Sequence, residues 1–396
     1  MKTEFEIDDD TLCVKKAQVS FFGYDSLAVP VCRASTIPYS DAKSFASRFE
    51  RDVDGYTYGL YGTPTHRFLE KKITELEQGR RTLLFPSGQA AITLAMLSVL
   101  KSGDKVLIPD CVYPPVRDFA NNELKRINVD PIFYDPCDLR TLESIIDDQT
   151  QLVWIESPGS TTMEIQDVRR IVKMSHAKGA LVGCDNTWAT PILFKPLLFG
   201  ADIVVEALSK YLSGHSDILM GSVTVMDPDL GLKLKAALGR MGIGTSPDDC
   251  SLVLRGIETL PVRLERAAKT AKSLACWIAN QRITKKVLHP ALNDCPGHDL
   301  WKRDFKGASG VFSVILNAEA VPHVQAALDV LKTFSIGASW GGTKSLIAPM
   351  TVNAFRSAKP WIGPDMVLRI SAGMESEESL INDLELFFEK IVERMP

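Results

Sequence analysis

Between residues 80 and 225 the chain alternates short, uniformly apolar runs with segments of helical spacing. Runs without a polar face are buried on both sides, and such strands form parallel sheets that helices cover on both faces. The pattern therefore predicts an α/β fold with a mostly parallel seven-stranded sheet. The runs are 83–85, 106–108, 131–134, 152–155, 181–184, 203–205 and 223–225, and the expected helices are 90–100, 115–124, 139–146 and 168–177.

The segments on either side of this core have a different character. Residues 1–60 are broken by prolines and polar clusters, and we expect them to form an arm without a core of its own. A long helical region, about 229–281, then leaves the sheet. We expect a large domain over residues 61–256 and a smaller α+β domain over residues 257–396 that ends in an amphipathic helix.

The charge and the cysteine content exclude several classes of protein. The formal net charge is −4 and no dense basic block occurs, which argues against nucleic-acid binding. No apolar run approaches the ~20 residues that span a bilayer, and the acidic N-terminus lacks the apolar stretch of a signal peptide. The eight cysteines show no CxxC pair and no metal-ligand spacing. We therefore expect a cytoplasmic protein with reduced thiols, no membrane partner and no metal site.

Residues that suit a ligand follow the apolar runs. In parallel sheets, ligands bind beyond the carboxyl ends of the strands. Each residue alone has an ordinary explanation, because a Ser-Gly turn usually only caps a helix and a tyrosine in a proline-rich loop is common. Their order at the ends of successive runs is what favours a binding site. The features are the turn Ser87-Gly88-Gln89, Tyr113, the turn 156–160 that ends at Ser160, Asp185, and the pair Ser209-Lys210.

Lys210 is the residue around which these features fit together. It follows the run 203–205, so its amine stands at the mouth of a buried sheet, where partial burial lowers the pKa and leaves a neutral nucleophile. Asp185 is placed to hold a ring N–H⁺, and the helix start at Gly88 is placed to bind a phosphate. The sequence predicts pyridoxal 5′-phosphate (PLP), held by Lys210 as a Schiff base.

A set of short motifs runs through nearly the whole chain. They are 58–59, 62–65, 87–91, Tyr113, 156–160, 185–188, 209–217, 339–342 and Arg369. Together they resemble the Cys/Met-metabolism family of PLP enzymes, and the runs ESPGS, DNTW and SWGG resemble its cystathionine β-lyase branch. The resemblance implies the aminotransferase type I fold. It also implies a homo-oligomer, a tetramer of dimers that share active sites.

The resemblance implies a role for each matching residue. Lys210 forms the Schiff base and removes the Cα proton, Asp185 pairs with the pyridinium nitrogen, and Tyr113 stacks on the ring and shares in proton transfer. Arg369 clamps the substrate α-carboxylate. The other implied cofactor contacts are Gly88, Gln89, Ser160, Ser209 and Tyr58, which the arm of the neighbouring subunit contributes, and the other substrate contacts are Ser339, Trp340 and the same Tyr58.

The implied reaction is β-elimination of cystathionine, or of a related thioether amino acid, to a thiol, pyruvate and ammonia. Two alternatives stay open: γ-elimination or γ-replacement on a γ-substituted amino acid, and a cofactor-binding relic without activity. Departures from the family's usual residues keep them open. Leu60 stands where an arginine is usual, and Gln89 stands where a methionine is common. Thr343 and Lys344 stand where an aromatic or aliphatic residue and a glutamate are usual, and Pro114-Pro115 replaces the usual glycines.

Overall fold

The computed structural model describes residues 7–17, 19–21, 24–50 and 54–396. The strands of its larger sheet are β3 (Arg81–Phe85), β4 (Lys105–Pro109), β5 (Asp130–Tyr134), β6 (Thr150–Glu156), β7 (Leu181–Asp185), β8 (Ile203–Glu206) and β9 (Gly221–Val225). They lie in the order β3-β9-β8-β7-β6-β4-β5. Of these, β9 alone runs antiparallel to the other six. The prediction of a mostly parallel seven-stranded sheet is confirmed.

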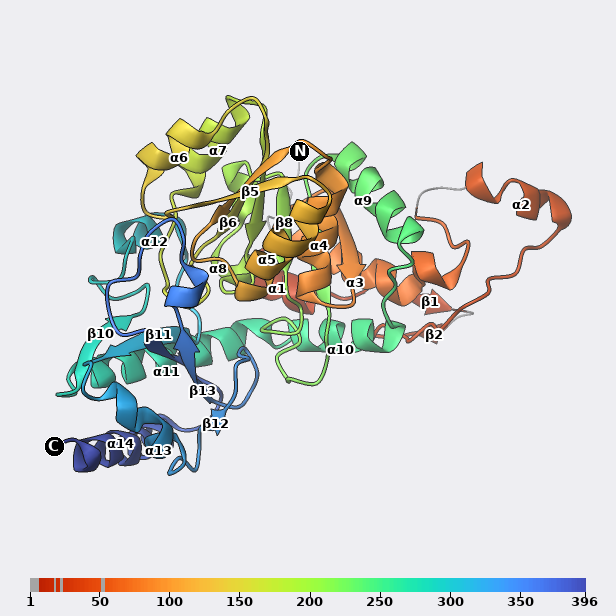
Figure 1. Cartoon of the computed structure of the whole chain (residues 1–396). Coiled ribbons are helices and arrows are strands. Elements are labelled where there is room, and N and C mark those ends of the chain that lie inside the picture. Colours follow the sequence, from red (N-terminus) through yellow and green to blue (C-terminus); the bar gives the residue numbers. More distant parts are fainter. Residues whose placement is uncertain (1–6, 18, 22–23, 51–53) are drawn as a thin grey trace, which may run out of the picture.

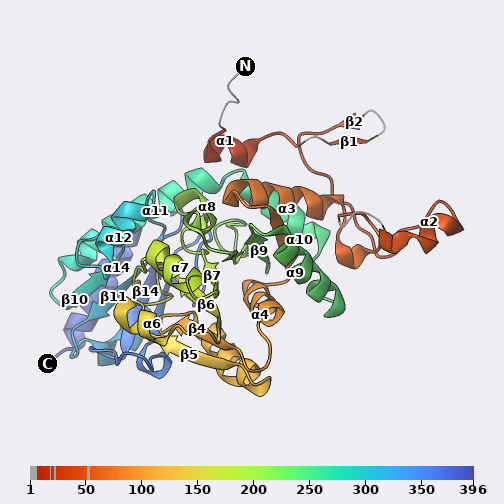
Figure 2. The same cartoon turned by 90° about the horizontal axis from the view of Figure 1, so that it is seen from above.

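Helices cover both faces of this sheet (Figure 1, Figure 2). They are α3 (Pro64–Glu77), α4 (Gly88–Val99), α5 (Pro114–Phe119), α6 (Leu139–Ile145), α7 (Val168–His176), α9 (Pro228–Arg240), α10 (Pro247–Ile257) and α11 (Leu260–Ala279). Consecutive strand residues point to opposite faces. Thus Ile108 packs with α4, α5 and α9, whereas Leu107 belongs to the cluster with α3, α6, α7, α10 and α11. This double cover is the reason that the strands are apolar throughout.

The region expected as one long helical stretch, 229–281, is divided into α9, α10 and α11. The first break contains Gly242, which has a φ of +66°, and the next helix opens on Pro247. A proline at the first position of a helix has no N–H to lose, so it marks a new helix start. None of the helices within the described ranges is long and apolar enough to cross a membrane.

A second, smaller sheet lies beyond α11 (Figure 1). Its strands are β10 (Thr284–Leu288), β11 (Val311–Leu316), β12 (Ser335–Ile336), β13 (Leu346–Thr351) and β14 (Met366–Ser371). They lie in the order β10-β11-β14-β13-β12, and α14 (Glu377–Arg394) packs against them through Leu384 and Phe387. The sequence pattern missed β10 and β13. β10 is an edge strand, and β13 pairs on its outer side with the two-residue β12 only at Leu346 and Ile347, so the lysines of β10 and Pro349 of β13 are tolerated there and interrupt the apolar run.

The N-terminal segment is anchored at one point and projects at another. Helix α1 (Asp9–Val14) buries Leu12 and Cys13 in the core cluster of the large sheet. The buried amine of Lys195 holds Asp9 at 2.9 Å. By contrast, α2 (Ala42–Ala46) has no buried residue and stands away from the body (Figure 1, Figure 2). The segment that was expected to lack a core therefore contributes to the main one, and its contact with a neighbouring subunit stays a prediction.

Two carboxyl groups are buried together on the α3 side of the large sheet. Glu77 ends α3 and Glu206 ends β8, their exposures are 0% and 1%, and none of their four carboxyl oxygens has a donor among the described residues. Burial raises the pKa of both, and the charge of Glu77 adds to this for Glu206. Lys195 and Asp9 also face Glu77, and Asp185 and Asn186 face Glu206. Two bare carboxylates cannot be buried side by side, so the pair holds a proton.

Replacing Glu77 by glutamine is expected to reduce the fall of stability with rising pH. Above the ordinary glutamate pKa of about 4.3, the folded protein binds more protons than the unfolded chain because its pKa values are raised. Stability is therefore lost as the pH rises through the raised values. Glutamine carries no charge and can donate to Glu206. We expect the apparent Tm of the variant, relative to wild type, to rise by about 2 °C between roughly pH 5.5 and pH 8.5.

Differential scanning fluorimetry across this pH range measures the effect. Glu75→Gln is the matched control, because Glu75 lies on the same helix but is partly exposed and only 3.7 Å from Lys15. That substitution is expected to shift Tm equally at every pH. Parallel pH profiles of wild type and Glu77→Gln would contradict the shared proton.

Candidate active site

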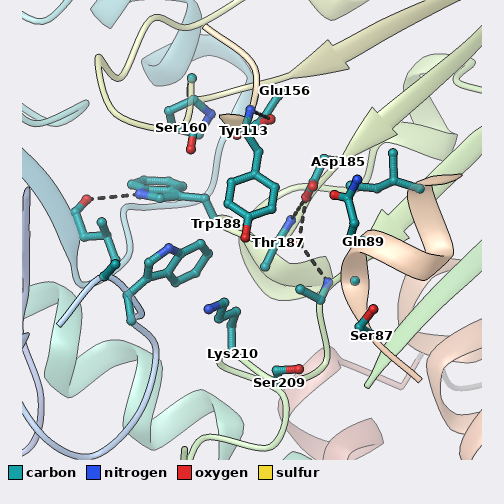
Figure 3. A pocket seen from close by; sticks show the side chains of 18 of the residues that line it. Ser87, Gln89, Tyr113, Glu156, Ser160, Asp185, Thr187, Trp188, Ser209 and Lys210 are labelled. Carbon is teal, nitrogen blue, oxygen red and sulfur yellow. Dashed lines mark hydrogen bonds between the residues drawn. The ribbon is translucent and has the colours of Figure 1, made fainter. Parts of the chain in front are cut away.

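A cavity of about 190 Å³ opens at the edge of the large sheet where β6 and β7 end (Figure 3). Parallel strands bring their carboxyl ends to one edge, so residues far apart in sequence meet here. The loop before β13 and a residue of β14 close the cavity from the smaller sheet. The predicted site residues that line it are Gly88, Gln89, Tyr113, Ser160, Asp185, Ser209, Lys210, Trp340 and Arg369.

Lys210 lies in the turn that follows β8 and points into the cavity (Figure 3). Its amine donates a hydrogen bond to the hydroxyl of Ser339 at 2.7 Å. Burial, together with the positive charge of Arg369, lowers the pKa of Lys210 to about 8, although Asp185 opposes the shift. The amine of an exposed lysine has a pKa of about 10.4. Lys210 therefore becomes a neutral base or nucleophile far more readily than an ordinary lysine.

The loop that carries Ser339 passes close to Lys210. A Cβ on Gly341 would lie 3.1 Å from the Cα of Lys210 and 2.9 Å from the nitrogen of Tyr211. Gly341 also has a φ of +81°, which favours glycine. A glycine at this position is thus what lets the loop from the smaller sheet reach the lysine.

Asp185, the last residue of β7, presents one free oxygen to the cavity. Its Oδ1 accepts the N–H of Thr187 at 2.9 Å and the hydroxyl of Thr187 at 2.6 Å. The same hydroxyl accepts the N–H of Ala207 at 2.9 Å, so the group that holds the carboxylate is itself fixed by the backbone. Burial raises the pKa of Asp185, and Thr187 and Lys210 oppose the rise. Its Oδ2 has no partner among the described residues and is available to a ring N–H⁺.

The N-terminus of α4 forms the other end of the cavity. Ser87 caps this helix by accepting the N–H of Ala90 at 3.0 Å. In the described part of the chain no acceptor lies on the amides of Gly88 and Gln89, and both residues line the cavity. A 12-residue helix that directs free N–H groups at a cavity favours an anion such as a phosphate.

Two predicted phosphate contacts are already engaged in the protein. The hydroxyl of Ser209 donates to the carbonyl of Met220 at 3.1 Å and accepts its N–H at 2.9 Å. The side-chain amide of Gln89 donates to the carbonyl of Pro115 at 3.1 Å, while its buried Oε1 lacks a donor. The backbone amides of α4 are therefore the free donors at this end.

Arg369 of β14 is a buried cation without a protein anion. It is 5% exposed, it donates to the carbonyl of Ala338, and it makes no ion pair within the described residues. Burial lowers its pKa, although Tyr113 and Glu156 oppose this. A guanidinium that is buried without a partner is costly, and a bidentate carboxylate would satisfy it. Trp340 lines the cavity beside it, with its ring centre 5.4 Å from the amine of Lys210.

Other predicted residues lie outside the cavity of their own chain. Tyr58 is 48% exposed, and its hydroxyl is 3.4 Å from that of Ser35. Leu60 lines a separate hollow, where it faces Gly244. Neither Thr343 nor Lys344 lines the cavity. Of the departures from the family's usual residues, Gln89 alone is thus at the surface that a ligand of this chain's own cavity would touch.

The sequence interpretation assigned no role to several residues that line the cavity. Thr187 follows Asp185 by two residues, and that spacing was the available signal for a hydroxyl that holds the carboxylate. Trp188 is held by a hydrogen bond from its Nε1 to the carbonyl of Val311 at 3.0 Å, a contact between the two sheets that sequence spacing does not reveal. Glu156 and Leu219 also line it. No cluster of three or more metal-ligating side chains occurs in residues 7–17, 19–21, 24–50 and 54–396.

The donor set fits PLP, with an amine of lowered pKa for its aldehyde, a free carboxylate oxygen for its ring nitrogen and open amides for its phosphate. The sheet order and this placement at the strand ends define a PLP-dependent enzyme of the aminotransferase type I class.

Comparison with known proteins specifies the family. The chain matches the family described as "Cys/Met metabolism PLP-dependent enzyme" over residues 10–389, and it belongs to that family. It is 39% identical over 371 residues to the L-alanine/L-glutamate racemase of Wolbachia pipientis wMel, with 91% of each chain covered. It is 35% identical over 391 residues to the cystathionine beta-lyase of Salmonella typhimurium, with 97% and 98% covered. Cystathionine gamma synthase from Xanthomonas oryzae pv. oryzae has the same fold, with a TM-score of 0.90, 30% identity, and 98% and 100% covered.

Proposed function

We propose that this enzyme cleaves a carbon–sulfur bond by β-elimination on cystathionine or a related thioether amino acid, and releases a thiol, pyruvate and ammonia. The observation that carries the proposal is the shared cavity of Lys210, whose amine has a lowered pKa, and Arg369, whose buried guanidinium lacks an anion. The ESPGS, DNTW and SWGG runs support the β-lyase branch, as does the name of the Salmonella relative.

Each polar residue of the cavity that takes part in the proposed reaction has a separate role. Arg369 binds the α-carboxylate and brings Cα toward Lys210, whose neutral amine accepts the Cα proton. Bound PLP supplies the electron sink for the charge that develops at Cα. Asp185 keeps a proton on the ring nitrogen. Burial raises the pKa of Tyr113, so its hydroxyl retains a proton that it can deliver to the departing sulfur.

A panel of amino acids tests the reaction. We expect cystathionine and other β-thioethers to yield pyruvate and one equivalent of thiol. A lactate dehydrogenase assay measures the pyruvate, and titration measures the thiol. Gamma-substituted amino acids are the matched set, because γ-elimination would release 2-oxobutyrate instead. Release of 2-oxobutyrate without pyruvate would overturn the β-elimination proposal and favour the γ-reaction.

Racemisation is a second candidate, which the Wolbachia relative favours. It shares the removal of the Cα proton but returns a proton to the opposite face. Lys210 and Tyr113 enter the cavity from different elements, and each can carry a proton (Figure 3). In the same panel, formation of D-alanine or D-glutamate without any keto acid, read by chiral chromatography, would replace the lyase proposal with this one.

We also propose that the active site is completed by a second copy. Within the cavity lining, the cations are Lys210 and Arg369, so the phosphate end has none of its own. Tyr58 is exposed and stands outside the cavity of its chain. Four further expectations stay predictions. They are an arm of residues 1–60 that reaches a neighbouring subunit, domains over 61–256 and 257–396, a tetramer of dimers, and a cytoplasmic location.

A further inference from the structure

Glu156, the last residue of β6, makes a contact that the reaction described above does not use. It is 9% exposed and lines the cavity, and its Oε2 accepts the backbone N–H of Tyr113 at 2.7 Å (Figure 3). Its other carboxyl oxygen has no partner among the described residues. The contact spans 43 residues of sequence and joins the end of β6 to the loop between β4 and α5.

The loop after β4 has few backbone N–H groups that could hold Tyr113 in place. Tyr113 is followed by Pro114 and Pro115, which have no N–H to donate. The next amides, of Val116 and Arg117, both donate to the carbonyl of Tyr113 and so close the first turn of α5. The amide of Tyr113 is therefore the one donor of the Tyr113–Pro115 segment, and Glu156 is its acceptor. Without that acceptor, the only backbone hydrogen bonds that Tyr113 itself keeps are those its carbonyl accepts, and the residue is 41% exposed.

We propose that Glu156 is a positioning residue: its carboxyl group holds the backbone amide of Tyr113 and thereby fixes the tyrosine ring in the cavity. The catalytic consequence rests on the role of Tyr113 in the proposed function, whereas the structural contact does not. A proton carrier that is displaced by about an ångström loses much of its effect on rate. Glu156 thus acts on the chemistry through Tyr113 and not by contact with the substrate.

Glu156 performs this role as a neutral acid. It lies directly opposite Asp185 in the pairing of β6 with β7, and no lysine, arginine or histidine of the described ranges forms an ion pair with it. Burial and the charge of Asp185 raise its pKa well above the usual range, and the Tyr113 amide and Arg369 oppose this. The other titratable groups that face it are Cys111, Tyr113, Glu164 and Cys184. Two adjacent carboxyls in different protonation states can take separate roles.

Amide hydrogen exchange at Tyr113 gives a readout that does not require turnover. A fragment spanning residues 110–117 has few exchanging amides because Pro114 and Pro115 contribute none. In Glu156→Ala we expect exchange at Tyr113 to accelerate about tenfold or more in the protein without and with PLP, since its acceptor is lost. Glu156→Gln retains a carbonyl acceptor and should stay within about threefold of wild type. Glu156→Asp, which withdraws the carboxyl by one methylene, is the second variant. It should also accelerate exchange at Tyr113, and it serves as the test if the alanine variant does not fold.

Kinetics and visible circular dichroism connect the contact to the site. We expect kcat of Glu156→Ala to fall about tenfold with little change in KM, and the dichroism band of bound PLP to change, while Glu156→Gln restores both. The matched control is Asp383→Ala, which removes a buried carboxylate that accepts three backbone N–H groups at residues 332–334. It should lower Tm but leave Tyr113 exchange and the dichroism unchanged.

The outcomes separate this inference from the proposed reaction. Unchanged exchange at Tyr113 in Glu156→Ala and Glu156→Asp would overturn the positioning role. If Glu156→Gln were as impaired as Glu156→Ala, the claim that Glu156 acts as a neutral acid would be overturned. Faster exchange at Tyr113 in a protein that turns over no amino acid of the panel supports the positioning role and removes the proposed reaction alone.

Discussion

Lys210→Ala is expected to abolish turnover and covalent attachment of PLP. The lysine is the amine of the cavity, its pKa is lowered to about 8, and Ser339 holds it at 2.7 Å. Removal of a general base alone costs on the order of 10²–10⁴-fold in rate, and here the covalent anchor is lost as well. We expect the rate to fall by at least about 10³-fold.

Borohydride reduction followed by peptide mapping measures the attachment directly. Wild type should carry the reduced cofactor mass on the peptide that contains Lys210, and the alanine variant should carry none. Lys233→Ala is the control, because Lys233 is an exposed lysine on α9 outside the cavity. Turnover by Lys210→Ala, or attachment of the cofactor at another lysine, would refute the assignment.

Arg369→Leu is expected to raise KM steeply. Arg369 is 5% exposed, donates to the carbonyl of Ala338, and has no anionic partner among the described residues until a substrate carboxylate arrives. Loss of one partner of a buried charge pair costs about 2–5 kcal/mol, which corresponds to roughly 30- to 5,000-fold in kcat/KM. Because the carboxylate is bound equally before and during the reaction, most of the loss should appear in KM.

Arg369→Lys separates charge from geometry. Lysine keeps the positive charge but cannot form two parallel hydrogen bonds to a carboxylate. We expect the kcat/KM of Arg369→Lys to be only about tenfold higher than that of Arg369→Leu. The kinetics of amine analogues that lack the carboxylate should not change with either substitution. Initial-rate kinetics supply both parameters. A leucine variant with the KM of wild type would remove Arg369 from the carboxylate role.

The large sheet was predictable because every strand carries its own signal. Leu107 and Ile108 are both apolar since one faces each layer of helices, and this needs no knowledge of which strands are neighbours. β10 and β13 were not predictable in the same way. β10 is an edge strand and β13 is covered on its outer side only at Leu346 and Ile347, and there a strand is defined by its partner and not by an apolar run.

The sequence predicted which residues meet at the candidate site, but it did not predict the hydrogen bonds between them. The strand-end rule brought Tyr113, Asp185 and Lys210 to one edge from local signals. It could not show that Ser209 is engaged with Met220, or that Thr187 holds Asp185, because these contacts depend on side-chain directions within the fold. Nor could it show the link between Glu156 and Tyr113.

Local pattern by itself determined the layered α/β fold, the lysine at the end of β8 and the choice of cofactor, since periodicity and residue type act over a few positions. Tertiary structure alone decided the electrostatics of the cavity. The lowered pKa of Lys210 and the unpaired charge of Arg369 follow from burial between two sheets. Burial is a property of the packed molecule, and no stretch of sequence specifies how far a charge lies from water.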